Sequence, residues 1–148
     1  MTQFGSYEIV DLLERGEYAS VYKARKPHDR PDRFSAITVL QDPIDPGDED
    51  TWKAFARAAR IGVQIRHPNL CEYKEAGRLG RYIYLVTEHI EGPTLYQLNK
   101  VAGSLEDPPD DRVILPIAQD VADALEALHR AEIGGKKVRA VHSLCPDV

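Results

Sequence analysis

The chain has 148 residues, of which 43% are hydrophobic and 29% charged, and its formal net charge is -5. This length is typical of one domain with a real hydrophobic core, and the negative charge argues against general binding to nucleic acids or anionic membranes. Because no run is apolar enough for a membrane helix and no signal-peptide pattern is present, we expect no membrane contact within this segment and a cytoplasmic location. Cys71 and Cys145 share no motif or metal-ligand spacing, which favours reduced thiols over a disulfide.

Three predicted strands open the chain. Residues 7–13 alternate loosely between apolar and polar side chains, residues 14–17 form a turn, and residues 18–24 return as a second strand. A polar segment rich in Pro and Asp then leads to residues 35–40. This short apolar run contains several β-branched residues and indicates a third, mostly buried strand.

Thr38 is the polar member of the third strand. Side chains alternate between two faces along a strand, so Ala36, Thr38 and Leu40 share one face and Ile37 and Val39 share the other. A buried threonine can satisfy its hydroxyl locally. The residue therefore acquires meaning only from its position in a larger pattern.

A helix and two further strands follow. The acceptor-rich residues 48–51 suit a helix N-terminus, where side chains cap free amides and negative charge meets the helix dipole. Apolar residues recur at helical spacing over residues 52–65, and the His-Pro-Asn segment that follows ends this helix. Residues 70–76 and 81–89 read as strands joined by a turn at Gly77–Gly80. Three strands, one helix and two more strands make a small α+β unit.

The second part of the chain is predicted to be helical. Residues 94–101 form a short helix, and residues 111–133 form a long one after a polar loop. Pro116 lies in the second turn of the long helix, so this helix either starts late or bends there. A flexible basic turn at residues 134–137 leads to an apolar tail. The apolar stripe of the long helix consists of Ile114, Ile117, Val121, Leu125 and Leu128.

Five segments stand in a recognisable order. They are Leu13 to Ala24, Ala36-Ile37-Thr38, Arg66-His67-Pro68-Asn69-Leu70, Tyr84 to Gly92, and Val121 to His129 followed by Val141-His142. In this order they resemble five parts of a serine/threonine protein kinase domain of the bacterial type. These parts are, in turn, the phosphate loop, the Ala-Ile-Lys strand, the segment after helix C, the fifth strand with its gatekeeper and hinge, and helix E with the catalytic-loop entry. Each likeness alone is a weak signal, whereas five in the right order are a strong one.

The resemblance implies an α+β fold and a division into two parts. Residues 1–91 correspond to a protein-kinase-like N-lobe with its hinge, in which a five-stranded antiparallel sheet packs with helix C. Residues 92–148 correspond to a partial C-lobe, with helices D and E and a degenerate catalytic-loop start. The family's metal-binding and substrate-binding segments have no counterpart in these 148 residues. We therefore expect either the N-terminal part of a longer protein or a truncated natural domain.

The resemblance also implies where a nucleotide cleft lies. Val21 and Ala36 correspond to its roof, Thr87 to the gatekeeper, and residues 88–90 to the hinge. Adenine recognition relies on apolar walls and hinge backbone groups more than on charge, so these parts stay plausible as a binding site. The full set of implied cleft positions is Leu13, Gly16, Ala19, Val21, Ala36, Thr38, Thr87, Glu88 and Ile90.

The phosphate loop has lost most of its glycines. Only Gly16 of the three remains, while Glu14 stands at the first position and Ala19 at the third. Glycines let backbone amides approach phosphates closely. The segment therefore predicts a plain hairpin turn rather than a phosphate cradle.

Both ends of the family's lysine–glutamate pair are missing. Thr38 stands where the strand-three lysine holds the nucleotide phosphates, and residues 27–52 contain no lysine that a shift of the alignment could supply. The helix C glutamate falls near Ala58, and residues 51–70 contain no Asp or Glu. Loss of one partner alone would leave an unpaired buried charge, at about 3–5 kcal/mol. Loss of both predicts a relaxed neutral core. Lys23 is an alternative cation, which we expect to be a solvated strand-end lysine.

The catalytic loop is degenerate as well. The family pattern His-Arg-Asp, then Lys-Pro, falls on residues 142–148, with no Asp before Pro146 and Cys145 at the place of the lysine. Asp147 follows the proline, where it is badly placed to act as the base. A nucleophilic pair of Cys145 with His142 is the alternative, but no orienting residue or oxyanion donor accompanies it.

These losses predict a catalytically impaired pseudokinase that acts as an interaction or regulatory module. One alternative is an ATP-binding serine/threonine protein kinase whose remaining catalytic parts lie beyond residue 148, and a second is a small-ligand sensor that uses the adenine cleft. We expect no required cofactor, no metal site, and at most weak, magnesium-independent binding of ATP. We also expect a protein partner or self-association along the apolar stripe of the long helix, and no nucleic-acid partner. The basic residues Lys53, Arg57 and Arg60 either dock an acidic partner or form a solvated helix face.

Overall fold

The computed structural model describes residues 3–43, 45, 47–104, 110–133 and 136–137. Six strands form one antiparallel sheet in the order β1-β2-β3-β4-β6-β5. The strands are β1 Gln3–Phe4, β2 Tyr7–Arg15, β3 Ala19–Arg25, β4 Ser35–Leu40, β5 Tyr73–Leu79 and β6 Tyr82–Glu88. The helices in this part of the chain are α1 Glu49–Gln64, α2 Leu95–Ser104 and α3 Asp111–Arg130, and a short ribbon pairs β7 Glu132–Ile133 with β8 Lys136–Lys137.

The predicted five strands and three helices are all present; β4 has the predicted ends, and the other elements differ from the prediction at one end or both. The two-residue strand β1 adds a sixth member to the sheet edge, where Phe4 pairs with Tyr7 across a tight turn with a positive φ of 58° at Gly5. The predicted turn at Gly77–Gly80 is wrong, because β5 continues to Leu79 and the turn is formed by Gly80 and Arg81. Gly80 has a φ of 61°, which glycine adopts without steric cost.

The end of the long helix and the segment after it also differ from the predictions. The long helix begins at Asp111 and ends at Arg130, so it does not start late, and Pro116 lies inside it. Proline there removes one backbone hydrogen bond of the second turn, which the remaining turns tolerate. Lys136-Lys137 is not a flexible turn but pairs as β8. The predicted catalytic-loop residues 142–148, Cys145 among them, lie outside the described residues.

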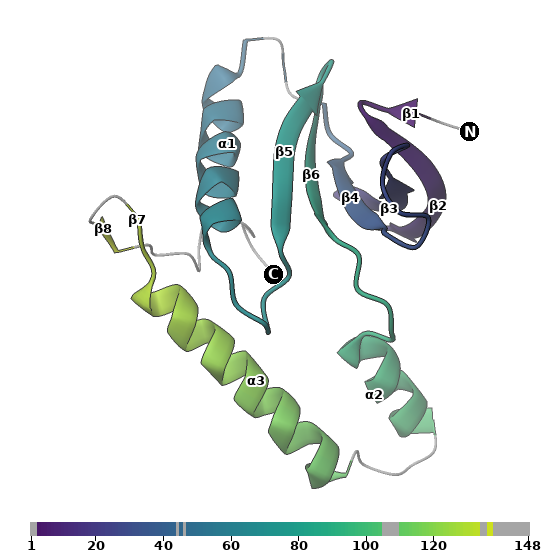
Figure 1. Ribbon diagram of the computed structural model, residues 1–148, viewed down its shortest axis with the longest axis vertical. Coiled ribbons are helices and arrows are strands. Elements are labelled where there is room, and N and C mark those ends of the chain that lie inside the picture. The colour runs from purple at the N-terminus through teal and green to yellow at the C-terminus, as the bar shows by residue number, and fades with distance from the viewer. Residues whose placement is uncertain (1–2, 44, 46, 105–109, 134–135, 138–148) are drawn as a thin grey trace.

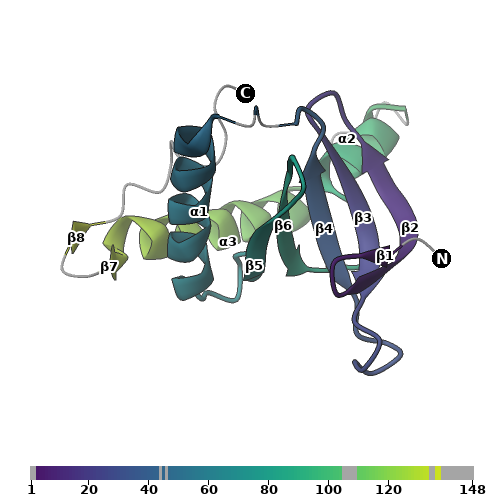
Figure 2. The same ribbon diagram turned by 90° about the horizontal axis from the view of Figure 1, so that it is seen from above.

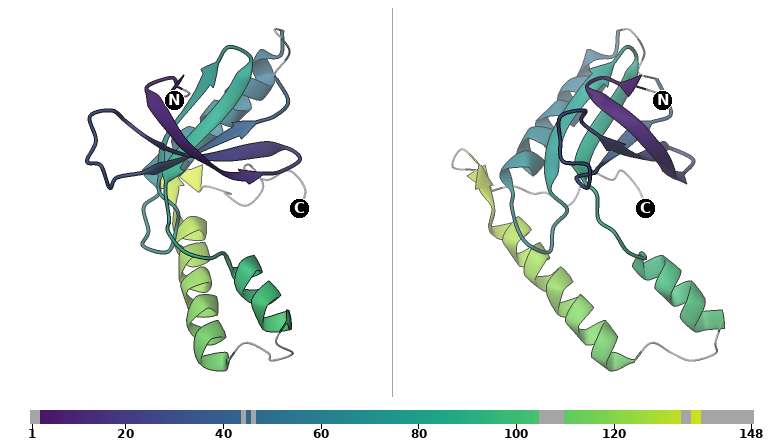
Figure 3. Two further views of the ribbon diagram at one scale, coloured as in Figure 1. Left: turned by 90° about the vertical axis from the view of Figure 1, so that its right-hand side faces the viewer. Right: turned by 45° about the vertical axis from the view of Figure 1, so that its right-hand side comes forward.

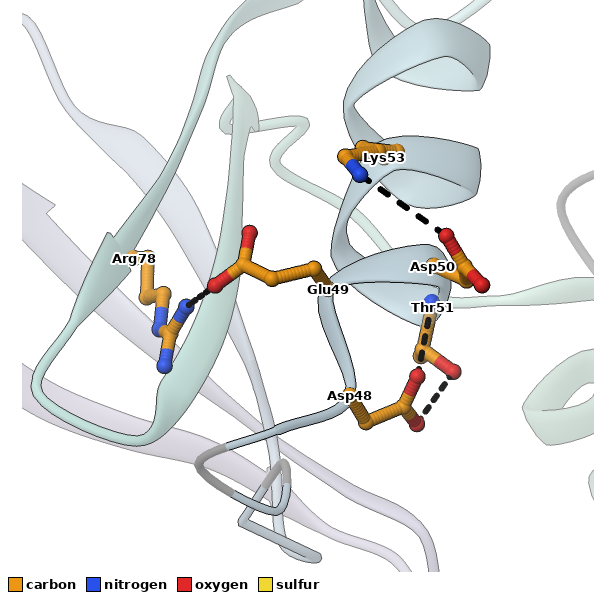
Figure 4. Close-up of polar contacts among 6 residues, drawn as sticks. All are labelled: Asp48, Glu49, Asp50, Thr51, Lys53 and Arg78. Carbon is orange, nitrogen blue, oxygen red and sulfur yellow. Dashed lines mark hydrogen bonds and ion pairs between the residues drawn. The ribbon is translucent and has the colours of Figure 1, made fainter.

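The first turn of α1 is fixed by its cap, as predicted. The Asp48 carboxylate accepts a hydrogen bond from the Thr51 amide at 3.0 Å and another from the Thr51 hydroxyl at 2.6 Å (Figure 4). These bonds favour the charged form and lower the pKa of Asp48. In the same turn Glu49 pairs with Arg78 of β5 at 3.4 Å, which ties the helix start to the sheet.

Helix α1 packs beside β5 (Figures 1 and 2). Its residues Ala58 and Ala59 are buried, and Trp52 and Phe55 stack with ring centroids 6.2 Å apart. A side chain at Gly62 would run into the Tyr73 ring of β5, so the helix approaches the strand through this glycine. The basic residues Lys53, Arg57 and Arg60 are exposed on the outer side of α1.

A compact core lies on the sheet face that carries Ile37. Tyr7, Ala24, Ile37 and Val86 are each at most 3% exposed and form one cluster. The Tyr7 hydroxyl donates to the Glu75 carboxylate at 3.2 Å, and burial raises the pKa of Tyr7. Partly buried residues complete the cluster; they are Phe4, Ile9, Val39 and Tyr84.

Helices α2 and α3 extend away from the sheet (Figures 1 and 3). A capping box starts α2, in which the Thr94 hydroxyl accepts from the Gln97 amide at 3.2 Å and the Gln97 side chain accepts from the Thr94 amide at 2.8 Å. Asn69 links the loop after α1 to α3, because its side-chain amide donates to the backbone and side-chain oxygens of Asp120 at 3.2 and 3.1 Å. Among the described residues, no helix is long and apolar enough to cross a membrane.

Candidate functional site

The candidate site lies on the sheet face opposite the core, which we call the cleft face. Residues directly opposite each other in an antiparallel pair point to the same side of the sheet. Ala36 pairs with Lys23 on β3 and with Thr87 on β6, and Thr38 pairs with Val21 and Leu85 in the same way. Tyr73 of β5, which pairs with Thr87 and contacts α1, shows that α1 lies on this side of the sheet.

Five of the nine predicted cleft positions share this face. Val21 and Thr38 form one cross-strand row, Ala36 and Thr87 form a second, and Ala19 sits opposite Leu40 in a third. The register thus places the predicted roof, the lysine-equivalent position and the gatekeeper together on one surface.

The other four predicted positions lie elsewhere. Leu13 is the extra residue of a bulge between Leu12 and Glu14 and is 44% exposed. The side chain of Glu88 belongs to the core-face register, and its carboxylate accepts a hydrogen bond from the Glu72 amide at 2.8 Å. Ile90 follows the end of β6 and is 64% exposed, and Gly16 lies in the β2–β3 turn. Any contact of these residues with a cleft ligand therefore involves backbone groups or a change of side-chain position.

The β2–β3 turn is closed by internal hydrogen bonds. The Gly16 amide donates to the Ala19 carbonyl at 2.9 Å, as in the plain hairpin turn that the sequence predicts. Gln41, directly after β4, adds a clamp: its side-chain amide donates to the Gly16 carbonyl at 2.6 Å and to the Ser20 hydroxyl at 3.2 Å. The Gln41 backbone amide also donates to the Tyr18 carbonyl at 2.9 Å. Sequence reasoning missed this clamp because a glutamine in a polar loop carries no distinctive signal.

The position of the missing lysine–glutamate pair is neutral. Thr38 is half-buried on the cleft face, and Ala58 is only 7% exposed on α1. The acidic residues of α1 lie in its first turn, where Glu49 is engaged by Arg78 and Asp50 by Lys53. The described residues thus contain no acid of α1 that is left to bind a cation on the cleft face.

Lys23 is not the solvated lysine that we expected from the sequence. Its Nζ lies 3.4 Å from the Glu91 carboxylate and 4.1 Å from the centre of the Phe34 ring, and its side chain is only 21% exposed. Both partners come from loops that flank the sheet, so sequence order gave no hint of the contact. Lys23 also pairs with Ala36 rather than Thr38. It therefore stands one row away from the lysine-equivalent position and is already engaged there.

The predicted hinge is bonded to the start of β5. The Glu88 amide donates to the Glu72 carbonyl at 2.9 Å, and the Glu88 carbonyl accepts from the Thr87 hydroxyl at 3.2 Å and the Cys71 thiol at 3.9 Å. Partial burial raises the pKa of the Cys71 thiol, and this cysteine is free.

Charged residues line a surface cavity of about 230 Å³ beside the predicted hinge. Its walls are Asp32, Arg33, Phe34, Glu72, Lys74, Glu88 and His89. Both signs of charge occur there, and Lys74 is held by the Ser35 hydroxyl at 2.9 Å. The described residues contain no group of three or more His, Cys, Asp or Glu side chains that could hold a metal ion.

The described part of the cleft does not fit a magnesium-bound nucleoside triphosphate. Such a ligand needs cations or free amides for its phosphates and carboxylates for the metal. At the positions that the structure describes, the lysine is replaced by Thr38, both backbone polar groups of Gly16 are bonded, and Glu14 occupies a glycine position.

Comparison with known proteins gives a consistent picture of the fold. A family model of protein tyrosine and serine/threonine kinases matches residues 7–143. The kinase domain of PknI from Mycobacterium tuberculosis superposes with a TM-score of 0.70 at 21% sequence identity, covering 87% of this chain and 51% of that chain. The α+β architecture with a kinase-like N-lobe and the start of a C-lobe, predicted from the sequence, is thereby confirmed.

Curated relatives are bacterial serine/threonine-protein kinases. A probable kinase of Clostridium perfringens is 29% identical over 141 residues, which are 95% of this chain and 20% of that protein. PknL of Mycobacterium tuberculosis is 31% identical over 141 residues, 95% of this chain and 34% of PknL. PrkC of Bacillus subtilis is 26% identical over 143 residues, 97% of this chain and 21% of PrkC. The chain therefore spans between a fifth and a third of the length of these relatives.

Proposed function

The chain belongs to the protein tyrosine and serine/threonine kinase family, and we propose that it is a catalytically impaired member, a pseudokinase. We propose further that it acts as an interaction or regulatory module in the cytoplasm. It requires no cofactor and transfers no phosphate through the residues described above. The division into an N-lobe over residues 1–91 and a partial C-lobe over residues 92–148 is part of this proposal.

One observation carries the proposal. Thr38 occupies the lysine-equivalent position on the cleft face, and no acidic residue of α1 is available opposite it. Phosphoryl transfer in this family depends on positioned charges around the nucleotide phosphates, since the protein contributes little covalent chemistry. A cleft that lacks the cation at this point has lost one of the groups that hold the phosphates.

Exposed apolar side chains support the interaction role. On α3, Val121 is 53% exposed and Leu125 is 42% exposed, and both belong to the stripe predicted from the sequence. Helix α2 adds Tyr96 at 75% and Val101 at 60%. Large exposed apolar patches are typical of surfaces that bind protein, and both helices expose side chains of this kind.

Phosphotransfer assays test the proposal. The natural protein that contains this chain is incubated with labelled ATP, magnesium or manganese, and a general protein substrate, and we expect no transfer above the level without protein. The Thr38→Lys variant is assayed in the same way. We expect no phosphate transfer by it either, because the glutamate that pairs with the family's lysine stays absent from α1. Metal-dependent transfer by the natural protein would falsify the proposal.

A second candidate is an active serine/threonine protein kinase. The names of the relatives favour it, since each is described as a serine/threonine-protein kinase or a probable one. In that case the catalytic groups come from residues outside the described part. Transfer in the assay above that disappears when the downstream sequence is deleted would support this candidate.

A further inference from the structure

We propose that the surface cavity beside the predicted hinge binds a small zwitterion, namely a free α-amino acid with a short apolar side chain. The cavity uses none of the five positions that share the cleft face, so the inference goes beyond the proposed function and does not depend on it. Three observations carry it: the way in which three strand ends meet, the balance of charges in the cavity, and the lack of ion pairs between those charges.

Three segments that are far apart in the sequence build the cavity. Residues 32–34 lead into β4, residues 72 and 74 lie at the start of β5, and residues 88 and 89 lie at the end of β6 and directly after it. Because β4 and β5 both run antiparallel to β6, on either side of it, their starts meet the end of β6 at one end of the sheet. The backbone hydrogen bond of 2.9 Å between Glu88 and Glu72 joins two of these segments. The sheet itself therefore holds the walls of the cavity in place.

Lys74 gives the cavity a cation with a fixed position. It is the extra residue of a bulge between Tyr73 and Glu75, an irregularity that re-aims a side chain. Its ammonium group reaches across β6 to the Ser35 hydroxyl at 2.9 Å and the Phe34 carbonyl at 3.5 Å. Both acceptors are neutral, and an ammonium group has three donors. One donor and the whole charge are therefore left for a ligand.

Glu88 gives the cavity an anion that is held in a similar way. Its carboxylate accepts a hydrogen bond from the Glu72 amide at 2.8 Å, which is a neutral donor. The carboxylate of Glu72 is already paired with Arg66 at 3.1 Å and adds no free charge. Among the described residues, Lys74 and Glu88 form no ion pair with each other or with a third residue. The cavity thus holds two opposite charges apart.

The loop before β4 adds one charge of each sign. Asp32 and Arg33 are exposed, and neither has an ion-pair partner within the part of the chain that the structure describes. With His89 counted as neutral, the free charges of the cavity sum to zero, two of each sign. An anion would be repelled by two carboxylates and a cation by two cations, whereas a zwitterion offers each sign an opposite partner.

The size of the cavity and its remaining wall fit an amino acid. Its volume of about 230 Å³ equals that of roughly seven to eight water molecules in the liquid, so a ligand of about that many non-hydrogen atoms fits. The half-buried Phe34 ring lies with the edge-on His89 ring 6.3 Å away between centroids. These rings offer an apolar surface to a short side chain, beside the charged groups that bind the ammonium and carboxylate groups.

Titration calorimetry of the natural protein that contains this chain tests the inference at about pH 7, where α-amino groups are mostly protonated. The probes are valine, 2-hydroxyisovalerate, which lacks the ammonium group, and valinamide, which lacks the carboxylate. We expect valine to bind in the millimolar range and each analogue at least about fivefold more weakly, because each loses one partly exposed ion pair. Equal binding of all three probes overturns the inference, and so does the absence of valine binding at about 20 mM.

Charge-removing variants locate the site. Glu88→Gln keeps an acceptor for the Glu72 amide and removes the negative charge, so valine should bind about threefold more weakly and 2-hydroxyisovalerate should gain relative to it. Lys74→Gln should weaken valine binding by a similar factor, and here valinamide should gain. Glu17→Gln and Lys53→Gln make the same exchanges on the β2–β3 turn and on α1, and should change neither affinity nor preference.

Circular dichroism shows whether each variant is folded. Unchanged preferences in folded Glu88→Gln and Lys74→Gln would place valine elsewhere and overturn the inference. If neither variant folds, the comparison of the three probes on the natural protein still decides it.

Discussion

At the scale of single residues, Thr38 illustrates how a threonine becomes informative through its neighbours. It is half-buried between Val21 and Leu85, and no acid of α1 faces its row. A lysine at this position must bring an ammonium group into a partly apolar row without the carboxylate that its family counterpart has. We therefore expect Thr38→Lys to lower the free energy of unfolding by about 1–3 kcal/mol.

Urea denaturation followed by circular dichroism measures this change, with Thr38→Val as the matched control. Valine keeps the branched shape and should change stability much less, by under about 1 kcal/mol. A lysine variant as stable as the natural chain would show that Glu14 or solvent accommodates the ammonium group, contrary to the neutral-core interpretation.

Asp48 provides a second prediction for a single residue. Its hydrogen bonds to Thr51 lower its pKa in the folded state, so it stabilises the fold at pH values above its unfolded pKa. That contribution is lost as the pH falls through the folded pKa. Thermal unfolding should show a lower Tm for Asp48→Ala at pH 7, and a smaller difference between variant and natural chain near pH 2.

Asp48→Ser is the matched control, because serine caps a helix without a titrating group. Its Tm at pH 7 should lie between those of the natural chain and the alanine variant. A difference between Asp48→Ala and the natural chain that stays constant from pH 7 to pH 2 would show that the charge does not contribute.

At the scale of elements, the contact between α1 and β5 depends on Gly62. Alanine is a better helix former than glycine by about 1 kcal/mol in a helix interior. Here, however, its methyl group would collide with the Tyr73 ring, close to the point where the ring joins the side chain. We expect Gly62→Ala to destabilise the fold by about 1–3 kcal/mol, as overpacking does in cores.

Chemical denaturation of Gly62→Ala measures the net change in the free energy of unfolding. Ala54→Gly, on the exposed side of the same helix, measures the difference in helix propensity between alanine and glycine without the collision. In the double variant Gly62→Ala with Tyr73→Ala, no ring is left for the new methyl group to collide with. Alanine at position 62 should then stabilise the helix through its higher helix propensity. A single Gly62→Ala variant that is more stable than the natural chain would show that α1 can move away from β5 at no cost.

Most elements could be predicted from the sequence, because their patterns are local. The cap at Asp48, the alternation in residues 35–40 and the stripe of α3 need only neighbouring residues to be recognised. The end of β5 was misplaced because Gly77 looks like a turn residue, whereas it lies opposite Tyr84 and leaves room for that ring. Strand β1 was missed because two residues carry no periodicity.

Five of the nine cleft positions implied by the resemblance share one face of the sheet, and the contacts around them could not be predicted. The family resemblance implied that Val21, Ala36 and Thr87 belong to one cleft, and the strand register places their side chains on one face. The bonds of Gln41 to the β2–β3 turn and of Lys23 to Glu91 join residues that are 25 and 68 positions apart. Such long-range pairs leave no trace in a single sequence, so the Gln41 bonds to the turn and the ion pair of Lys23 came from the structure alone.

At the scale of the whole molecule, the exposed apolar faces of α2 and α3 predict association. These helices extend from the sheet (Figure 3), and hydrogen bonds between Asn69 and Asp120 link α3 to the loop after α1. Val121 and Leu125 lie one turn apart and are both more than 40% exposed. Removal of such side chains from water is favourable by about 25 cal/mol per Å² of apolar surface. We therefore expect the chain to self-associate at micromolar concentrations.

Sedimentation velocity over a range of concentrations tests this expectation. The double variant Val121→Lys with Leu125→Lys should shift the distribution to monomer, because lysine side chains keep their charges in water and prevent close contact between apolar faces. Gln119→Lys adds a charge two positions away, on a different side of the same helix, and should leave the distribution unchanged. If the natural chain sediments as a clean monomer at high concentration, α2 and α3 are not a self-association surface. If all three proteins associate equally, the contact lies elsewhere, and the apolar stripe of α3 has no role in it.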